Sequence, residues 1–248
     1  NYYQFMKKLF LMTEKKIRLF LRNFIFNINL QKVKSSDELI NLHFDFYSEK
    51  THSNFNMFHF LLNNFDSKPL NILETGSSAH GSKSSHLFIN YIKKFGGSFY
   101  TVDINPDIKN LLMRYESDTI TVVTADSVQY LNSLDENIVK SLDVIFLDSF
   151  DLDLINPEPS EHHGLMEFES LFKNVKKGCL ISIDDTPSDY SLFSNATSDT
   201  EKIYESLKVQ KGDGYIPGKG RKVLDLIESD KSCKVIFHEY SVVIQKIN

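Results

Sequence analysis

The sequence predicts an α/β protein with a doubly wound, mostly parallel sheet and a helical extension in front of it. From residue 70 onward, short apolar runs alternate with helical patterns, which is typical of βαβ units. The last two β-rich runs are separated only by Glu239 and Tyr240, so they can pair directly only as an antiparallel hairpin. We therefore expect seven strands and an antiparallel last strand.

The predicted elements alternate along the chain. Asn105-Pro106 begins one helix, because a capping side chain precedes a proline at the first helical position. The strands are expected at residues 71–75, 98–102, 120–124, 142–147, 180–183, 234–238 and 241–245. The helices are expected at residues 37–47, 54–65, 84–95, 106–115, 127–134, 163–174 and 200–210, with a short helical stretch after the Gly/Pro loop at 212–220.

The first 34 residues form a basic arm in front of an acidic body. They hold eight Lys/Arg and one Glu, a net charge of +7, so that the chain's net charge of −5 leaves −12 on the remainder. Apolar residues at helical spacing predict one or two amphipathic helices here. Three interpretations stay open: packing on the body or on a second subunit, contact with an anionic membrane surface and, least favoured, contact with nucleic acid. We assign the helical extension to residues 1–53 and the main domain to 54–248.

The composition does not suggest an exported or membrane-spanning chain. Cys179 and Cys233 are too few for a disulfide framework. No secretory signal pattern begins the sequence, and polar residues such as Arg18 and Arg22 interrupt its most apolar segment. We expect a protein of the cytoplasm that is soluble or peripheral to a membrane.

A glycine-bearing loop follows the first predicted strand and opens a helix. Gly76 and Gly81 permit a tight turn and the close approach of a ligand, and the helix N-terminus supplies free N–H donors. The loop lacks the third glycine of the dinucleotide-binding fingerprint. It also differs from a phosphate-binding loop, because one extra residue separates Gly81 from Lys83. An NTPase is therefore disfavoured.

Three successive strands end in a carboxylate at the same edge of the predicted sheet. Asp103, Asp126 and Asp148 follow the second, third and fourth strands, and ligands bind at this edge in open α/β sheets. An acid at the position of Asp103 accepts hydrogen bonds from ribose hydroxyls in nucleotide-binding sheets. Helix capping explains Asp126 alone equally well, but it does not explain the whole series.

The fifth strand ends in two adjacent carboxylates, Asp184 and Asp185, which repel each other unless a cation or several donors compensate. With Asp148 they supply three hard oxygen ligands for Mg²⁺ or Mn²⁺; the alternative is a pair of solvated turn residues. His162 and His163 lie between these strands, so either is a candidate general base at the same edge. The alternative for the histidines is a capping or solvated pair.

In their order along the chain, these motifs resemble those of class I S-adenosylmethionine-dependent methyltransferases. The resemblance is strongest to the metal-dependent O-methyltransferases, some of which act on sugars, and it covers residues 54–248. It is carried by the stretches 72–82, 102–104, 125–127, 146–148 and 177–185. It implies a Rossmann-like sheet with strand order 3-2-1-4-5-7-6. His80 departs from the motif, where a glycine is usual, and the histidine that usually follows the first metal ligand is absent after Asp148.

The resemblance also implies a role for each site residue. Asp148, Asp184 and Asp185 would hold a divalent metal ion, and Asp148 with His163 or His162 would act on the acceptor. The methionine part, the ribose and the adenine of the cofactor would meet, in that order, Glu74, Gly76, Gly81 and Ser82, then Asp103, then Asp126 and Ser127.

The predicted function is methyl transfer from S-adenosylmethionine to a hydroxyl group of a small molecule or glycan, assisted by Mg²⁺ or another divalent cation. A saccharide as acceptor rests on the resemblance alone. Two alternatives stay open: an NAD-type oxidoreductase, and a catalytically silent binding module tethered by its basic arm. We expect no nucleic-acid partner. Contact of the arm with a membrane surface or with a second copy of the chain is one possibility beside its packing on the body.

Overall fold

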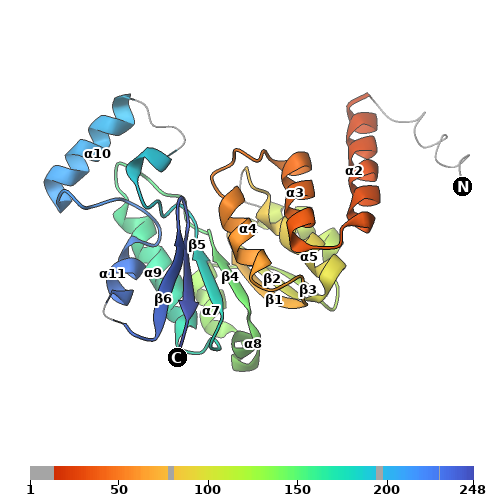
Figure 1. Cartoon of the computed structure of the whole chain (residues 1–248). Coiled ribbons are helices and arrows are strands. Elements are labelled where there is room, and N and C mark those ends of the chain that lie inside the picture. Colours follow the sequence, from red (N-terminus) through yellow and green to blue (C-terminus); the bar gives the residue numbers. More distant parts are fainter. Residues whose placement is uncertain (1–13, 78–80, 194–197, 229) are drawn as a thin grey trace, which may run out of the picture.

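The computed structural model describes residues 14–77, 81–193, 198–228 and 230–248 (Figure 1). Within them, seven strands form one sheet in the order β3-β2-β1-β4-β5-β7-β6. Strands β1 to β5 pair in parallel, whereas β7 is antiparallel to both β5 and β6. The predicted fold class and strand order are confirmed. The strands span Leu70–Thr75 (β1), Gly97–Asp103 (β2), Ile120–Thr124 (β3), Val144–Leu147 (β4), Leu180–Ile183 (β5), Cys233–His238 (β6) and Val242–Lys246 (β7).

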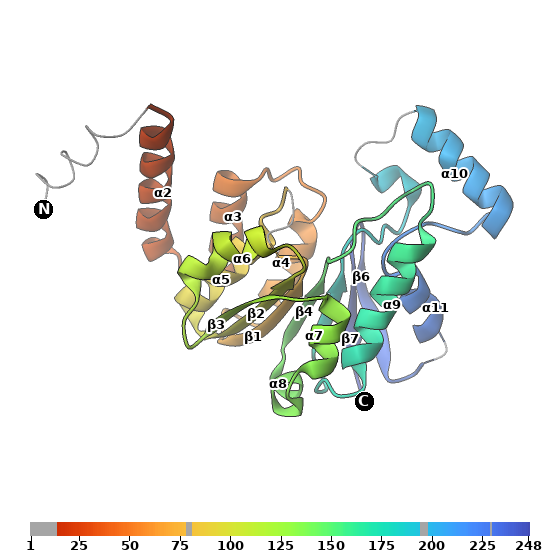
Figure 2. The same ribbon diagram turned by 180° about the vertical axis from the view of Figure 1, so that it is seen from behind.

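Helices cover both faces of the sheet, as Figures 1 and 2 show from opposite sides. Side chains alternate between the faces, so Ile72 and Phe146 belong to one apolar core, while Leu73 and Ile145 belong to the other. Helices α3, α4 and α5 pack on the first core, and α7, α8, α9 and α11 on the second. The helices span Glu14–Lys32 (α2), Ser36–Tyr47 (α3), Phe55–Asn63 (α4), Ser84–Phe95 (α5), Pro106–Leu112 (α6), Ser127–Ser133 (α7), Glu136–Ser141 (α8), Glu158–Phe172 (α9), Ser198–Lys211 (α10) and Arg221–Ile227 (α11).

Helix α9 begins five residues earlier than predicted, at Glu158 instead of His163. Pro159 is tolerated in its first turn, where a missing N–H leaves no hydrogen bond unmade, and Glu158 and Glu161 favour the positive end of the helix dipole. His162 and His163 therefore lie inside the helix. Helix α8 was not expected, and α6 is shorter than predicted because a 3₁₀ turn, Met113–Tyr115, follows it.

The N-terminal extension packs against the first core. Leu39, Ile40 and Phe44 of α3 are buried in that core, and α2 packs on α3. Residues 1–13 of the predicted arm lie outside the described residues. Among the helices that are described, none is long and apolar enough to cross a membrane. The domain boundary at residue 53 stays a prediction, as does the contact of the arm with a membrane or a second copy.

Candidate active site at the carboxyl ends of the strands

A cavity of about 590 Å³ opens at the carboxyl ends of the strands, the edge where α/β sheets bind their ligands. A smaller cavity of about 240 Å³ lies beside it and shares Gly76, Asp103 and Ser149 with it. The larger cavity is lined by residues from seven separate parts of the chain, among them His52, Asn54, Gly76, Ser82, Asp103, Asp148, Asp184, Asp185, Lys219 and Tyr240.

Gly76 directly follows β1 and lies against the backbone of Asp148 and Ser149. Its N–H donates to the carbonyl oxygen of Val102 at 3.0 Å, and its φ is +75°. A Cβ atom at this position would lie 2.0 Å from the carbonyl oxygen of Asp148, so only glycine fits. Gly76 lines both cavities, and Ser82 lines the larger one, whereas Gly81 lines neither.

Glu74 lies in β1 and lines neither cavity. Its carboxyl group is fully buried and accepts hydrogen bonds from the hydroxyls of Ser85 at 2.5 Å and Thr101 at 2.7 Å. Burial raises the pKa of Glu74 to about 7, although these hydrogen bonds oppose the shift. Glu74 therefore ties α5 and β2 to the end of β1.

The residues predicted for ribose and adenine lie at these cavities. Asp103 lines both, and its Oδ1 accepts the backbone N–H of Asn105 at 2.7 Å. Asp126 caps α7 by accepting the N–H of Gln129 at 2.9 Å, and it also lines the smaller cavity together with Ser127. Because a carboxylate has two oxygens, capping and ligand binding are compatible at Asp126.

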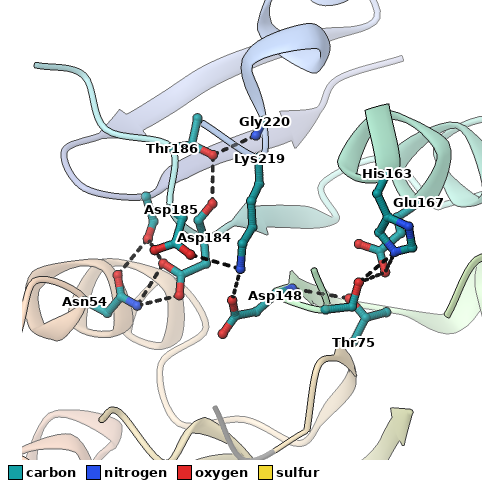
Figure 3. A network of polar contacts seen from close by, with 12 residues as sticks. Asn54, Thr75, Asp148, His163, Glu167, Asp184, Asp185, Thr186, Lys219 and Gly220 are labelled. Atoms are coloured by element: carbon teal, nitrogen blue, oxygen red, sulfur yellow. Dashed lines mark hydrogen bonds and ion pairs between the residues drawn. The ribbon is translucent and has the colours of Figure 1, made fainter. Parts of the chain in front are cut away.

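Lys219 lies among the three predicted metal ligands (Figure 3). Its Nζ is 2.6 Å from Asp148 Oδ1 and 3.0 Å from Asp185 Oδ2, and only 5% of its side chain is exposed. Burial alone would lower the pKa of Lys219, but the carboxylates of Asp148, Asp185 and Asp184 outweigh burial and raise it. The lysine is therefore a buried cation. We call these four residues the aspartate–lysine cluster.

Neutral donors complete the cluster. The side-chain amide of Asn54 donates to both oxygens of Asp184 at 2.9 and 3.0 Å, and the hydroxyl of Ser241 donates to Oδ1 of Asp184 at 2.6 Å. The hydroxyl of Tyr240 donates to Asp185 at 2.6 Å. Burial and the neighbouring charge of Asp185 raise the pKa of Asp184. Every carboxylate of the cluster thus has a partner within the chain.

The sequence interpretation missed Lys219 and these neutral donors. It required a cation or several donors beside Asp184 and Asp185, and it assigned that role to a metal ion. A signal was present in Gly218-Lys219-Gly220, a lysine within a Gly/Pro loop that follows the paired acids. Nothing in the local sequence marks Asn54 or Ser241, which reach the cluster only through tertiary packing.

The cluster has the donor chemistry of a site for a hard divalent cation. Asp148, Asp184 and Asp185 supply carboxylate oxygens from adjacent strand ends, and the ammonium of Lys219 already stands as a cation between two of them. Among the described residues, no three His, Cys, Asp or Glu side chains converge as metal ligands. The residue types therefore suit a divalent ion. In the structure, however, the carboxylates of Asp148 and Asp185 are arranged around the ammonium of Lys219.

His163 lies apart from the cluster, beside the smaller cavity (Figure 3). Its Nε2 is 2.9 Å from the hydroxyl of Ser149 and 3.0 Å from that of Ser127. Ser149 donates to Glu167 Oε1 at 2.7 Å, so it accepts its other hydrogen bond from His163. The imidazole is therefore oriented by a chain of hydrogen bonds that ends on a buried carboxylate.

A different histidine, His52, lines the larger cavity with the cluster. The backbone N–H of Asn54 donates to its Nδ1 at 3.2 Å, so the neutral ring carries its proton on Nε2. Burial lowers the pKa of His52, against the influence of Asp184 and Asp185. His52 can thus donate a hydrogen bond to a ligand, and the sequence interpretation did not identify it. His162, the alternative predicted base, is exposed on α9.

The structure is similar to solved structures of MycE, a methyltransferase from the mycinamycin biosynthetic pathway. With MycE in complex with Mg, SAH and mycinamycin VI, the TM-score is 0.54 at 17% sequence identity, over 87% of this chain and 55% of MycE. Two MycE structures with Mg and SAH give TM-scores of 0.51 and 0.50 at 15% and 16% identity. The chain has the methyltransferase fold. It spans about half the length of MycE. No protein-family model and no curated protein matches the sequence.

Proposed function

We propose that this chain transfers a methyl group from S-adenosylmethionine to a hydroxyl oxygen of an acceptor. One observation carries the proposal. In a sheet with this strand order, one cavity at the carboxyl ends of the strands is lined both by Gly76 and Asp103 and by the aspartate–lysine cluster. The first pair suits an adenosyl cofactor, and the cluster suits a polar acceptor beside it.

The cofactor would lie along the ends of β1, β2 and β3. Gly76 leaves room for the methionine part to approach the backbone, and Ser82 offers a hydroxyl on the same side. Asp103 would accept hydrogen bonds from the ribose hydroxyls. Asp126 and Ser127 would meet the adenine in the smaller cavity.

The acceptor would lie in the larger cavity beside the cluster. Methyl transfer is an in-line displacement, so the residues must hold the acceptor oxygen close to the sulfonium and in line with it. Its polar lining favours a hydroxyl-rich molecule such as a saccharide, with His52 as a hydrogen-bond donor. His163, the predicted proton acceptor, lines the adjoining smaller cavity and not this one, and the alternative, His162, is exposed on α9, so the role of either histidine stays a prediction.

A divalent cation fits the donor chemistry of the cluster, and MycE was crystallised with Mg. Asp148, Asp184 and Asp185 would hold the ion. When bound, it would supply Lewis-acid stabilisation of negative charge on the acceptor oxygen. The residues of the chain orient the acceptor and exclude water from the cavity floor, because Asp184 and its partners Asn54 and Ser241 are buried.

Binding of S-adenosylhomocysteine, the reaction product, tests this proposal by calorimetry. We expect the wild-type chain to bind it and Asp103→Ala to bind it about 10- to 100-fold more weakly, because hydrogen bonds to a carboxylate are lost. Asp107→Ala is the matched control, since Asp107 lies on α6 outside both cavities. No binding to the wild-type chain at millimolar ligand would overturn the proposal.

No observation favours the alternatives over methyl transfer. A dinucleotide-binding oxidoreductase has a parallel strand where this sheet has antiparallel β7, and it needs a third glycine that the loop lacks. A silent binding module gives no reason for a buried cluster of three carboxylates at the ligand-binding edge. Contact of the N-terminal arm with a membrane or a second copy stays a separate prediction.

A further inference from the structure

Lys219 occupies the position that a divalent ion would need. Its Nζ lies between Asp148 and Asp185, at 2.6 and 3.0 Å from their oxygens. A divalent metal binds carboxylate oxygens at about 2.0 to 2.6 Å, so it would have to lie at least as close to these oxygens as Nζ does. An ammonium and a metal ion cannot share this space, and like charges at such a separation repel strongly.

The backbone around Lys219 is held from three sides. Its N–H donates to the carbonyl oxygen of Asp185 at 3.0 Å, and the N–H of Gly220 donates to the hydroxyl of Thr186 at 2.8 Å. Helix α9 packs on the same loop at Gly164, where a Cβ would lie 2.3 Å from the carbonyl oxygen of Lys219. Because the backbone is fixed, Nζ could leave the cluster only through a change in the side-chain torsions of Lys219.

The charges of the cluster do not balance. Three carboxylates face one ammonium, and the other partners, Asn54, Ser241 and Tyr240, are neutral donors. The net negative charge thus attracts a divalent ion. When no divalent ion is bound, the charge of Lys219 reduces the repulsion between the carboxylates. The attraction of the carboxylates for a divalent ion is therefore opposed by the ammonium of Lys219, which lies between Asp148 and Asp185.

We propose that Lys219 is a built-in competitor of the divalent ion: the ion binds the aspartates only when the lysine side chain leaves the space between Asp148 and Asp185. The inference rests on the proposed function for the identity of the ion as a divalent metal. It has two consequences. Lys219 weakens metal binding, and its positive charge offsets part of the carboxylate charge when no ion is bound.

Calorimetry with Mn²⁺ tests the competition in the full chain. Lys219→Met keeps the length of the side chain and removes its charge, and we expect it to bind Mn²⁺ at least about tenfold more tightly than the wild type. Lys222→Met is the matched control, because Lys222 is partly exposed and pairs with Glu158 at 3.6 Å. Equal affinities of Lys219→Met and wild type, or the same gain in Lys222→Met, would refute the competition.

A second measurement uses the wild-type chain and decides the question if Lys219→Met does not fold. Reductive methylation followed by mass spectrometry reports how accessible each lysine is. We expect millimolar Mn²⁺ to increase the modification of Lys219, whose side chain is 5% exposed in the structure, and to leave Lys222 unchanged. A modification of Lys219 that does not respond to Mn²⁺ would then rule the inference out.

Binding of S-adenosylhomocysteine, measured on the same preparations, separates this inference from the proposed function. If the product binds but Lys219→Met leaves Mn²⁺ affinity unchanged, only the competition is wrong. If Lys219→Met tightens Mn²⁺ binding but the product does not bind, only the proposed function is wrong.

Discussion

The two halves of the ligand-binding edge are built in different ways. At the ends of β2 and β3, Asp103 and Asp126 are partly exposed and accept backbone N–H groups two or three residues further along. At the ends of β4 and β5, the side chains of Asp148 and Asp184 are nearly fully buried. Their side-chain partners include residues 71 and 130 positions away in the sequence.

This difference predicts how each half responds to mutation. A carboxylate held by local backbone contacts can be removed with little loss of stability, so its loss reports on ligand binding. A buried carboxylate that neutralises a buried lysine cannot be removed alone, because the lysine is left without its charge partner. The cofactor half and the cluster half should therefore separate in experiments that measure stability and binding together.

Asp148→Ala gives the largest expected effect. Removing this carboxylate leaves Lys219 buried with Asp185 as its remaining close partner, and we expect a loss of about 3 kcal/mol in the free energy of unfolding, together with loss of turnover. Asp103→Ala, at the equivalent place on β2, should change stability by less than about 0.5 kcal/mol. Urea unfolding measures the free energy of unfolding of both variants. Similar losses of this free energy in Asp148→Ala and Asp103→Ala would contradict the distinction between the halves.

Glu74 sharpens the comparison, because it is a buried carboxyl in the cofactor half. Its pKa is raised from 4.5 to about 7 in the folded chain, so folding favours the protonated form and this contribution is lost as pH rises through 7. The free energy of unfolding of the wild type, relative to Glu74→Gln, should therefore fall by about 2 kcal/mol between pH 5 and pH 8. The comparison with Glu74→Gln cancels the titration of the histidines. A constant difference would show that Glu74 is ionised throughout.

His163 lies at the border of the two halves, and its substitution has the smallest expected effect on a binding constant. It lines the smaller cavity with Asp126 and Ser127, so we expect His163→Ala to weaken the binding of S-adenosylhomocysteine by up to about tenfold. His162→Ala is the control, because His162 is exposed on the same helix. Unchanged product binding with turnover lowered by about 100-fold would instead support His163 as the proton acceptor.

Local patterns in the sequence determined the fold class and half of the site. Strand and helix periods, turn residues and caps act over a few positions, so the alternation from residue 70 and the start of α6 at Pro106 were predictable. Asp103 and Asp126 could be assigned to the ligand-binding edge because a parallel strand brings the residue after it there. The strand order followed from the resemblance to methyltransferases.

Only the tertiary structure decided the partners of the buried carboxylates. Lys219, Asn54 and Ser241 come from three distant segments, and their meeting depends on how α4, β7 and the loop before α11 pack on the sheet. The tertiary structure also decided the place of His163, which was predicted beside the metal ligands and lies instead within hydrogen-bonding distance of Ser149. The physical reason is that burial makes unpaired charge costly, and the chain satisfies that charge with whichever donor its packing brings near.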